Sequence, residues 1–104
     1  MIARELLRRV KAALSEEFQD RFRGIVLFGS EARGDAADDS DVDLLVLLRG
    51  PVKVGDDLDR IIKATYPIQL EVDRVLSAIP MDERAYEEGS RRFLRQVRRE
   101  GILV

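Results

Sequence analysis

The run VDLLVLL, residues 42–48, is the feature that most constrains how this 104-residue chain can fold. Only Asp43 interrupts its apolar residues, and a second short run, GIVLF at residues 24–28, has the same character. Apolar runs of this length are typical of strands that are covered on both faces. We therefore predict two inner strands in a sheet that is packed between other elements.

The rest of the chain predicts helices around these strands. The residue pattern indicates four helices, at residues 2–19, about 58–66, about 82–88 and about 91–100. The second should end before Pro67, and the last should be capped by Ser90 and ended by Gly101. The alternation in IQLEVDRV predicts a third strand over 68–75 with one polar face. This order predicts an α+β (mixed α/β) fold with a small mixed sheet of about three or four strands flanked by helices.

Composition limits the chemistry that the chain can perform. It contains no Cys and no His, which excludes disulfides, thiol chemistry, zinc sites of the usual kind and Ser-His or Cys-His mechanisms. Catalysis would have to use carboxylates, Arg, Lys, Tyr, Ser, backbone amides and a hard metal. A net charge of -2 provides no overall basic field, so direct nucleic-acid binding is not expected.

Length and hydropathy limit the organisation of the chain. Residues 1–104 are expected to form a single domain with no separate substrate domain, so a partner should supply part of the site. No segment of the sequence is apolar for long enough to span a bilayer, and the acidic residues near the N-terminus argue against a transit peptide. The expected location is the cytoplasm.

Acidic residues gather directly in front of the second apolar run. They are Asp35, Asp38, Asp39, Asp41 and Asp43. Because side chains alternate along a strand, Asp41 and Asp43 should project from the same face. Two neighbouring carboxylates repel each other unless a divalent cation lies between them, and Mg²⁺ is typically held by one or two carboxylates together with substrate phosphates. Asp73, or in second place Glu71, could add a third acid from the third strand, as a two-metal phosphoryl-transfer site requires.

Gly29 and Ser30 stand where the first strand should give way to a short helix. Gly29 permits the close approach of a ligand, and free amides at a helix start, with Ser30 as cap, predict a phosphate cradle. Arg33 in the first turn would face the positive end of the helix dipole, so we expect an anion such as a triphosphate opposite it. Each feature alone is more often structural, and Arg33 could simply pair with Asp35 or Asp38. Their conjunction favours a nucleotide site.

The stretch GSEARGDAADDSDVDLLV resembles the signature of the DNA polymerase beta-like nucleotidyltransferases, and in particular that of the minimal nucleotidyltransferase (MNT) antitoxins. The pattern of this group is Gly-Ser, ten residues, then Asp-x-Asp, and ten residues separate Ser30 from Asp41. Arg33-Gly34 and Ser40 also stand where the group has them. The resemblance covers the chain nearly from end to end and implies the nucleotidyltransferase fold.

The resemblance also implies the roles of individual residues. Asp41 and Asp43 would ligate two Mg²⁺ ions, and a third acid, Asp73 in our preferred alignment, would join the catalytic metal and help to deprotonate the acceptor. Gly29 and Ser30 would hold the β and γ phosphates of ATP. Arg33 would contact a phosphate, and Ser40 would complete the nucleotide-binding set.

MNT proteins of this kind typically act beside a HEPN-domain partner, often an RNase toxin, and several transfer AMP from ATP to one of its tyrosines. The resemblance therefore implies an adenylyltransferase antitoxin. One alternative is a docking antitoxin that occludes its partner without catalysis. Another is RNA contact through the arginines of the last helix, which could equally form a solvated face: Arg91, Arg92, Arg95, Arg98 and Arg99. A larger nucleotidyltransferase is disfavoured because a substrate domain is missing.

Overall fold

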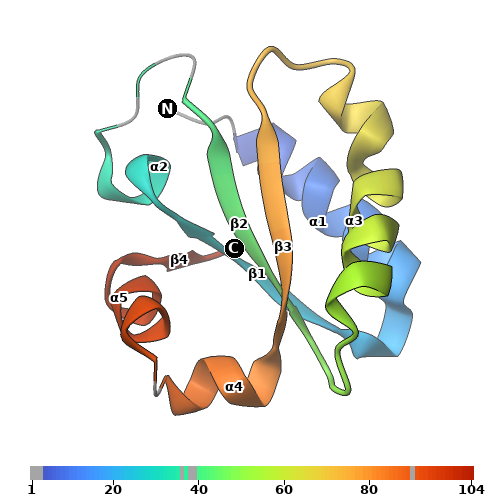
Figure 1. Cartoon of the computed structure of the whole chain (residues 1–104). Helices are drawn as coiled ribbons and strands as arrows, with labels where there is room; N and C mark the ends of the chain where they lie inside the picture. The colour runs from blue at the N-terminus through green and yellow to red at the C-terminus, as the bar shows by residue number, and fades with distance from the viewer. Residues whose placement is uncertain (1–3, 36, 38–39, 90) are drawn as a thin grey trace.

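A four-stranded mixed sheet with helices on both faces forms the structure, a computed structural model that describes residues 4–35, 37, 40–89 and 91–104 (Figure 1). Asp38, Asp39 and the predicted cap Ser90 lie outside the described residues. The elements are α1 (Arg4–Phe18), the 3-10 helix η1 (Gln19–Arg21), β1 (Phe22–Phe28), α2 (Ser30–Arg33), β2 (Val42–Leu48), α3 (Val54–Gln69), β3 (Leu76–Asp82), α4 (Glu83–Glu88), α5 (Arg92–Glu100) and β4 (Ile102–Leu103). The predicted fold class is confirmed.

The strand order is β3-β2-β1-β4, so the two apolar runs form the inner strands, as predicted. β1 is antiparallel to both β2 and β4, whereas β2 and β3 are parallel and are connected through α3. In this register Asp43 on β2 lies between Phe28 on β1 and Ser77 on β3. The end of β1, which leads into the glycine turn, and the start of β2, which carries the acidic residues, therefore lie side by side at one end of the sheet.

The two faces of the sheet belong to different apolar cores. α1 and α3 pack on the first face against the even-numbered residues of β2, including Leu44 and Val46. Leu45 and Leu47 face the opposite way, where they contact Val97 of α5. Because side chains alternate, Asp43 belongs to this second face. The acidic position therefore opens toward α5 rather than into the larger core.

The predicted end of the second helix is wrong, because α3 continues through Pro67 to Gln69. A proline inside a helix leaves the carbonyl four residues earlier without its amide partner. That residue is Lys63, which lies on the exposed side of the helix. Ile68, one residue after the proline, is buried in the core and anchors the last turn.

The predicted third strand over 68–75 is also wrong, since β3 begins at Leu76. Gln69 explains the difference. Its amide nitrogen donates to the Arg74 carbonyl at 2.8 Å, and its amide oxygen accepts from the Leu76 backbone at 2.7 Å. The side chain thereby closes a loop between helix and strand. The alternation in this segment comes from a helix end followed by a loop.

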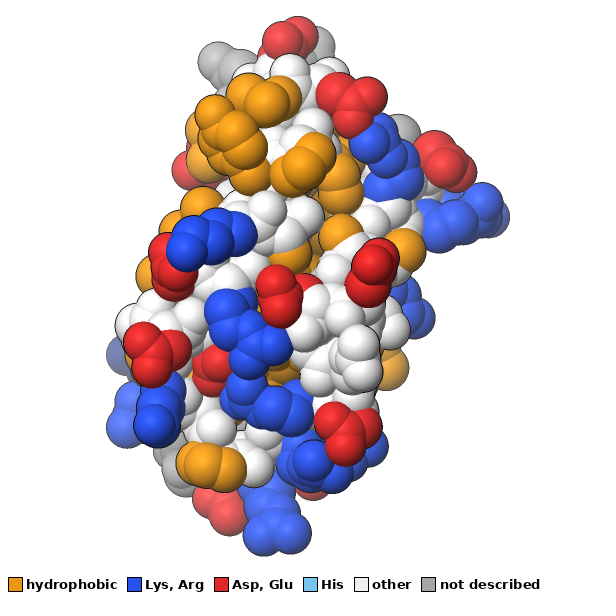
Figure 2. All heavy atoms as spheres, turned by 90° about the vertical axis from the view of Figure 1, so that its right-hand side faces the viewer, with side chains coloured by type: hydrophobic (Ala, Val, Ile, Leu, Met, Phe, Trp, Pro, Cys, Tyr) orange, Lys and Arg blue, Asp and Glu red, His pale blue; other side chains and the backbone are white. Residues whose placement is uncertain are grey.

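The α3 side of the molecule carries charges of both signs (Figure 2). Arg60 pairs with Glu17 at 3.2 Å, and Lys63 pairs with Asp59 at 2.9 Å. Hydrophobic side chains gather at the upper end of this view. This side therefore presents no uniformly basic surface. Within the part of the chain that the structure describes, no helix has the length and apolar character needed to cross a membrane.

Candidate active site

The turn after β1 brings its backbone directly against the acidic strand. Gly29 has φ 75° and ψ -155°, a conformation that is essentially restricted to glycine. A Cβ atom at this position would collide with an Asp43 carboxylate oxygen. The backbone conformation therefore requires glycine, and any larger residue would also force the Asp43 side chain to move. The predicted phosphate-binding turn and the predicted metal-binding residue are in contact.

The short helix after this turn differs from the prediction in one detail. Gly29, and not Ser30, is the N-cap residue of α2, and no side chain caps the helix. Ser30 is the first helical residue, and its carbonyl accepts a hydrogen bond from the Asp35 amide at 3.1 Å. The first amides of a helix have no acceptor within the helix. The turn therefore keeps the donor arrangement that a phosphate would use, without a competing serine cap.

Asp41 and Asp43 stand at the start of β2, the first exposed and the second half-buried. Burial raises the pKa of the Asp43 carboxyl above its usual value, the Asp41 carboxylate raises it further, and the Arg33 guanidinium lowers it. The structure thus brings Arg33 and both predicted metal ligands together. Two mutually repelling carboxylates are a donor set that fits a divalent cation such as Mg²⁺.

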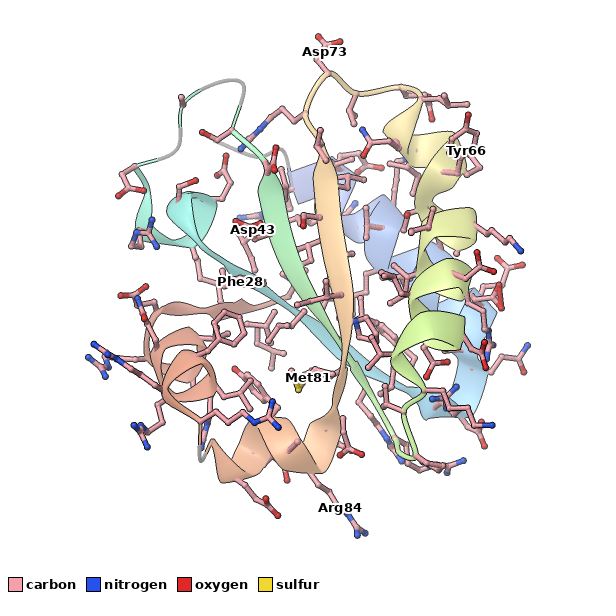
Figure 3. The ribbon with its side chains drawn as sticks, in the orientation of Figure 1. Phe28, Asp43, Tyr66, Asp73, Met81 and Arg84 are labelled. Carbon is pink, nitrogen blue, oxygen red and sulfur yellow. The ribbon has the colours of Figure 1, made fainter. Side chains whose placement is uncertain are left out.

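The structure does not bring the predicted third acid to this pair. Asp73 lies in the loop before β3, is exposed, and points outward at the tip of that loop (Figure 3). Glu71 pairs instead with Arg9 of α1. The residue of β3 beside Asp43 is Ser77. Among the described residues, no three His, Cys, Asp or Glu side chains gather where they could hold a metal.

Arg74 ties the parts of the site together, which the sequence did not reveal. Its guanidinium pairs with Glu31 of α2, and its Nε donates to the Ser40 carbonyl at 2.7 Å. The Arg74 and Glu31 side chains are only 14% and 4% exposed. One Arg74 nitrogen, Nη2, is buried and has no hydrogen-bond partner in the described part of the chain. In the sequence, Arg74 follows Ile68, Leu70 and Val72 at the same two-residue spacing, so a charged residue at this point of the alternation was the available signal.

Ser40, predicted to bind nucleotide, is used within its own loop. Its hydroxyl accepts from the Ala37 amide at 2.9 Å, and its amide donates to the Ala37 carbonyl at 3.1 Å. Together with the Arg74 bond, these contacts fix the chain just before Asp41. In this structure Ser40 therefore shapes the acidic loop.

A cavity of about 220 Å³ adjoins the turn on the α5 side. Its lining consists of Phe28, Gly29, Arg33, Phe93, Gln96, Val97 and Glu100. Phe28 and Phe93 meet edge to face, with ring centroids 5.7 Å apart. Arg33 also pairs with Glu100 at 3.7 Å. Phe28 directly precedes Gly29 in the sequence, but its contact with Phe93 of α5 depends on the fold.

The arginines of the last helix lie on its exposed side. Leu94 and Val97 are buried beneath them, which agrees with the interpretation that these arginines form the solvated face of an amphipathic helix. Arg98 donates to the Glu87 carbonyl at 2.6 Å and so joins α5 to α4. This contact gives at least one of these arginines a structural use.

Comparison with known proteins adds to this geometry. The family model described as "Nucleotidyltransferase domain" matches residues 7–102. Two proteins of Methanocaldococcus jannaschii, each named "Putative protein adenylyltransferase", are 35% identical over 77 residues and 33% identical over 75 residues. The alignments cover 73% and 72% of this chain and 70% and 75% of those proteins.

Two solved structures share the fold. One is described as a "putative nucleotidyltransferase" from Sulfolobus solfataricus, with a TM-score of 0.62, 21% identity, and coverage of 95% of this chain and 78% of that chain. The other is a toxin-antitoxin with AMP-PNP, with a TM-score of 0.64, 16% identity, and coverage of 93% and 70%.

Proposed function

Because the chain belongs to the nucleotidyltransferase domain family, we propose that it is an antitoxin that transfers AMP from Mg²⁺-bound ATP to a hydroxyl of a HEPN-family RNase toxin. The acceptor in this proposal is a tyrosine, and the modification neutralises the toxin. The family relation and the relatives named as adenylyltransferases support the reaction class. The HEPN partner and the tyrosine come from the resemblance of the Gly-Ser and Asp-x-Asp motif to MNT antitoxins.

The observation that carries the proposal is the contact between Gly29 and Asp43. A turn that excludes every side chain leaves its backbone open to a ligand, and here it does so beside a carboxylate. A turn with only a structural role would not need to place backbone without a side chain beside Asp43, a half-buried carboxyl whose pKa is raised by burial. A metal-bound triphosphate accounts for both features, since it binds amides through phosphate oxygens and carboxylates through the metal.

Each residue would have a defined part in the reaction. Asp41 and Asp43 would hold Mg²⁺, which neutralises charge on the phosphate oxygens. The backbone at Gly29 and Ser30 would bind the β and γ phosphates, and Arg33, which already lies near Asp43, would balance negative charge. Positioning and electrostatic stabilisation supply most of the catalysis in phosphoryl transfer.

In the proposed reaction the acceptor hydroxyl oxygen attacks the α-phosphorus of ATP. A new phosphorus–oxygen bond forms, the bond to the β-phosphate oxygen breaks, pyrophosphate leaves, and the hydroxyl proton passes to a base. Asp73 would serve as this base after the loop that carries it turns toward β2, because in this structure Asp73 is exposed at the tip of that loop. Ser77 occupies the neighbouring position on β3.

A docking antitoxin without catalysis is the second candidate, and one observation favours it. The strand beside Asp43 carries Ser77 where a third acid would complete the two-metal set. A protein that had lost transfer could still cover its partner. The toxin-antitoxin among the structural neighbours is compatible with both candidates.

One experiment separates these two functions. We would purify the wild type and an Asp41→Ala, Asp43→Ala double variant from the native host, and measure the intact mass of the co-purified partner together with cell survival. We expect both proteins to retain the partner, only the wild-type partner to carry AMP, and the double variant to protect poorly. Full protection by the double variant, with an unmodified partner throughout, would overturn transfer and support docking. A third protein, Asp73→Asn, tests the base. If its co-purified partner carries no AMP, Asp73 belongs to the site; if its partner carries AMP as with the wild type, Asp73 does not.

A further inference from the structure

We propose that the cavity between the end of β1 and α5 is the nucleobase subsite of the nucleotide site. This inference rests on the proposed function and adds the part of the substrate that the motif does not address. Whole drug-sized ligands occupy pockets of about 300–1,000 Å³. The cavity here measures about 220 Å³, which suits one part of a nucleotide rather than the whole molecule.

The position of the cavity relative to the phosphate turn supports this assignment. Gly29 lines the cavity and also contacts Asp43, so the two sites share one residue. Arg33 lines it as well, and its charge acts on the Asp43 carboxyl. If the turn and the acidic pair bind the triphosphate, the rest of the nucleotide can therefore lie next to this cavity.

The apolar lining has the chemistry that recognises a base. Phe28 and Phe93 form an edge-to-face pair with an interplanar angle of 84°, so their two rings present surfaces in different directions. Phe93 remains 48% exposed on a helix whose neighbouring residues are mostly arginine. Its ring gains little from the core, whereas a base stacked on it would cover it. Aromatic stacking binds any base, since every base has a π face.

The polar lining would orient the base. Gln96 offers both a donor and an acceptor through its amide, and the Glu100 carboxylate offers acceptors only. Glu100 pairs with Arg33, another lining residue, at 3.7 Å. A mainly apolar and aromatic lining with a few polar groups that fix orientation is the usual arrangement in small-molecule sites.

The test compares ATP with a ligand that has the phosphates but no base. Isothermal titration of the full chain with Mg²⁺ would measure the dissociation constants of ATP and of inorganic tripolyphosphate for three proteins: wild type, Phe93→Ala and Phe93→Tyr. We expect Phe93→Ala to weaken ATP about tenfold while tripolyphosphate is unchanged, because loss of one base–aromatic stack has roughly this effect. Phe93→Tyr keeps the ring and should bind ATP like the wild type.

Ile62→Ala is the matched control, because Ile62 is 54% exposed and lies on α3. It should change neither affinity, and thermal melting of all variants checks that they fold. Equal ATP affinity in wild type and Phe93→Ala, or equal affinity of the wild type for ATP and tripolyphosphate, would overturn the base subsite and leave the proposed function standing. Failure of the wild type to bind either ligand would overturn the proposed function itself.

Discussion

At the scale of single residues, Gly29 and Asp43 set the character of the site. The backbone at Gly29 adopts a conformation that other residues rarely take, and it does so where a Cβ atom would strike Asp43. Asp43 is in turn half-buried beside Asp41, which raises its pKa. Both residues are in arrangements that cost stability, and both are explained by a bound metal and phosphate.

Gly29→Ala should destabilise the protein by about 1–3 kcal/mol, the usual cost of a strained backbone conformation, and should abolish ATP binding. Gly55→Ala is the control, since Gly55 lies in α3 with open space around it and no positive φ. Because Gly55 is the second residue of α3, alanine there should raise stability by no more than about 0.5 kcal/mol, the lower end of the helix-interior value. Chemical denaturation measures both. Equal stability of the two variants would show that the Gly29 turn is not strained.

Asp43→Asn should hold or raise the melting temperature of the metal-free protein at pH 7. Folding raises the pKa of Asp43 above its reference value of 3.8. Its stabilising contribution is therefore complete below that value and is lost as the pH rises through the folded-state pKa. The advantage of the variant should consequently disappear in acid, and the variant should gain nothing from Mg²⁺ and ATP. A lower melting temperature at neutral pH would instead identify Asp43 as a structural hydrogen-bonding residue.

At the scale of elements, Arg74 joins three segments that are distant in sequence. It comes from the loop before β3, pairs with Glu31 on α2, and holds the Ser40 carbonyl just before β2. The phosphate turn and the acidic strand thus keep their relative position through a nearly buried ion pair. Breaking such a pair removes a counter-charge from a nearly buried carboxylate, which is costly.

Arg74→Met should therefore destabilise the protein by about 3 kcal/mol, the lower part of the range for broken buried pairs, because Arg74 retains some exposure. The control is Arg8→Met, whose pair with Glu5 is exposed on both sides and should contribute less than about 1 kcal/mol. Adding Glu31→Leu to Arg74→Met should recover part of the loss. If Arg74→Met cost no more than Arg8→Met in urea denaturation, the pair would have no role in holding the site.

Comparison of individual elements shows what the sequence could predict. The run at 42–48 was predicted with its correct bounds, because burial on both faces leaves an unambiguous apolar pattern. The segment at 68–75 was misread, since a buried Ile68 at a helix end followed by a loop imitates strand alternation. In the site, Gly29, Arg33 and Asp41 lie near Asp43, and their functional roles stay predictions. Arg74 and the Phe28–Phe93 cavity could not be predicted, because they depend on contacts between distant segments.

At the scale of the whole molecule, the C-terminal segment returns to the site. β4 pairs with the end of β1 through Leu103 and Ile102, and this pairing sets α5 beside the turn. Gly101 between α5 and β4 is packed so closely that a Cβ atom would lie 2.6 Å from a Val26 methyl carbon. The C-terminal segment therefore completes the cavity wall that the motif itself does not contain.

The most direct test of the central claim, AMP transfer by this chain, follows the phosphate that moves. Purified protein would be incubated with Mg²⁺ and a lysate of host cells that lack the chain, using ATP labelled at either the α or the γ phosphate. Transfer of AMP predicts that one lysate protein acquires the α label, that none acquires the γ label through this chain, and that Asp41→Ala, Asp43→Ala abolishes labelling. Absence of α label with the wild type, or equal labelling with the double variant, would contradict the account.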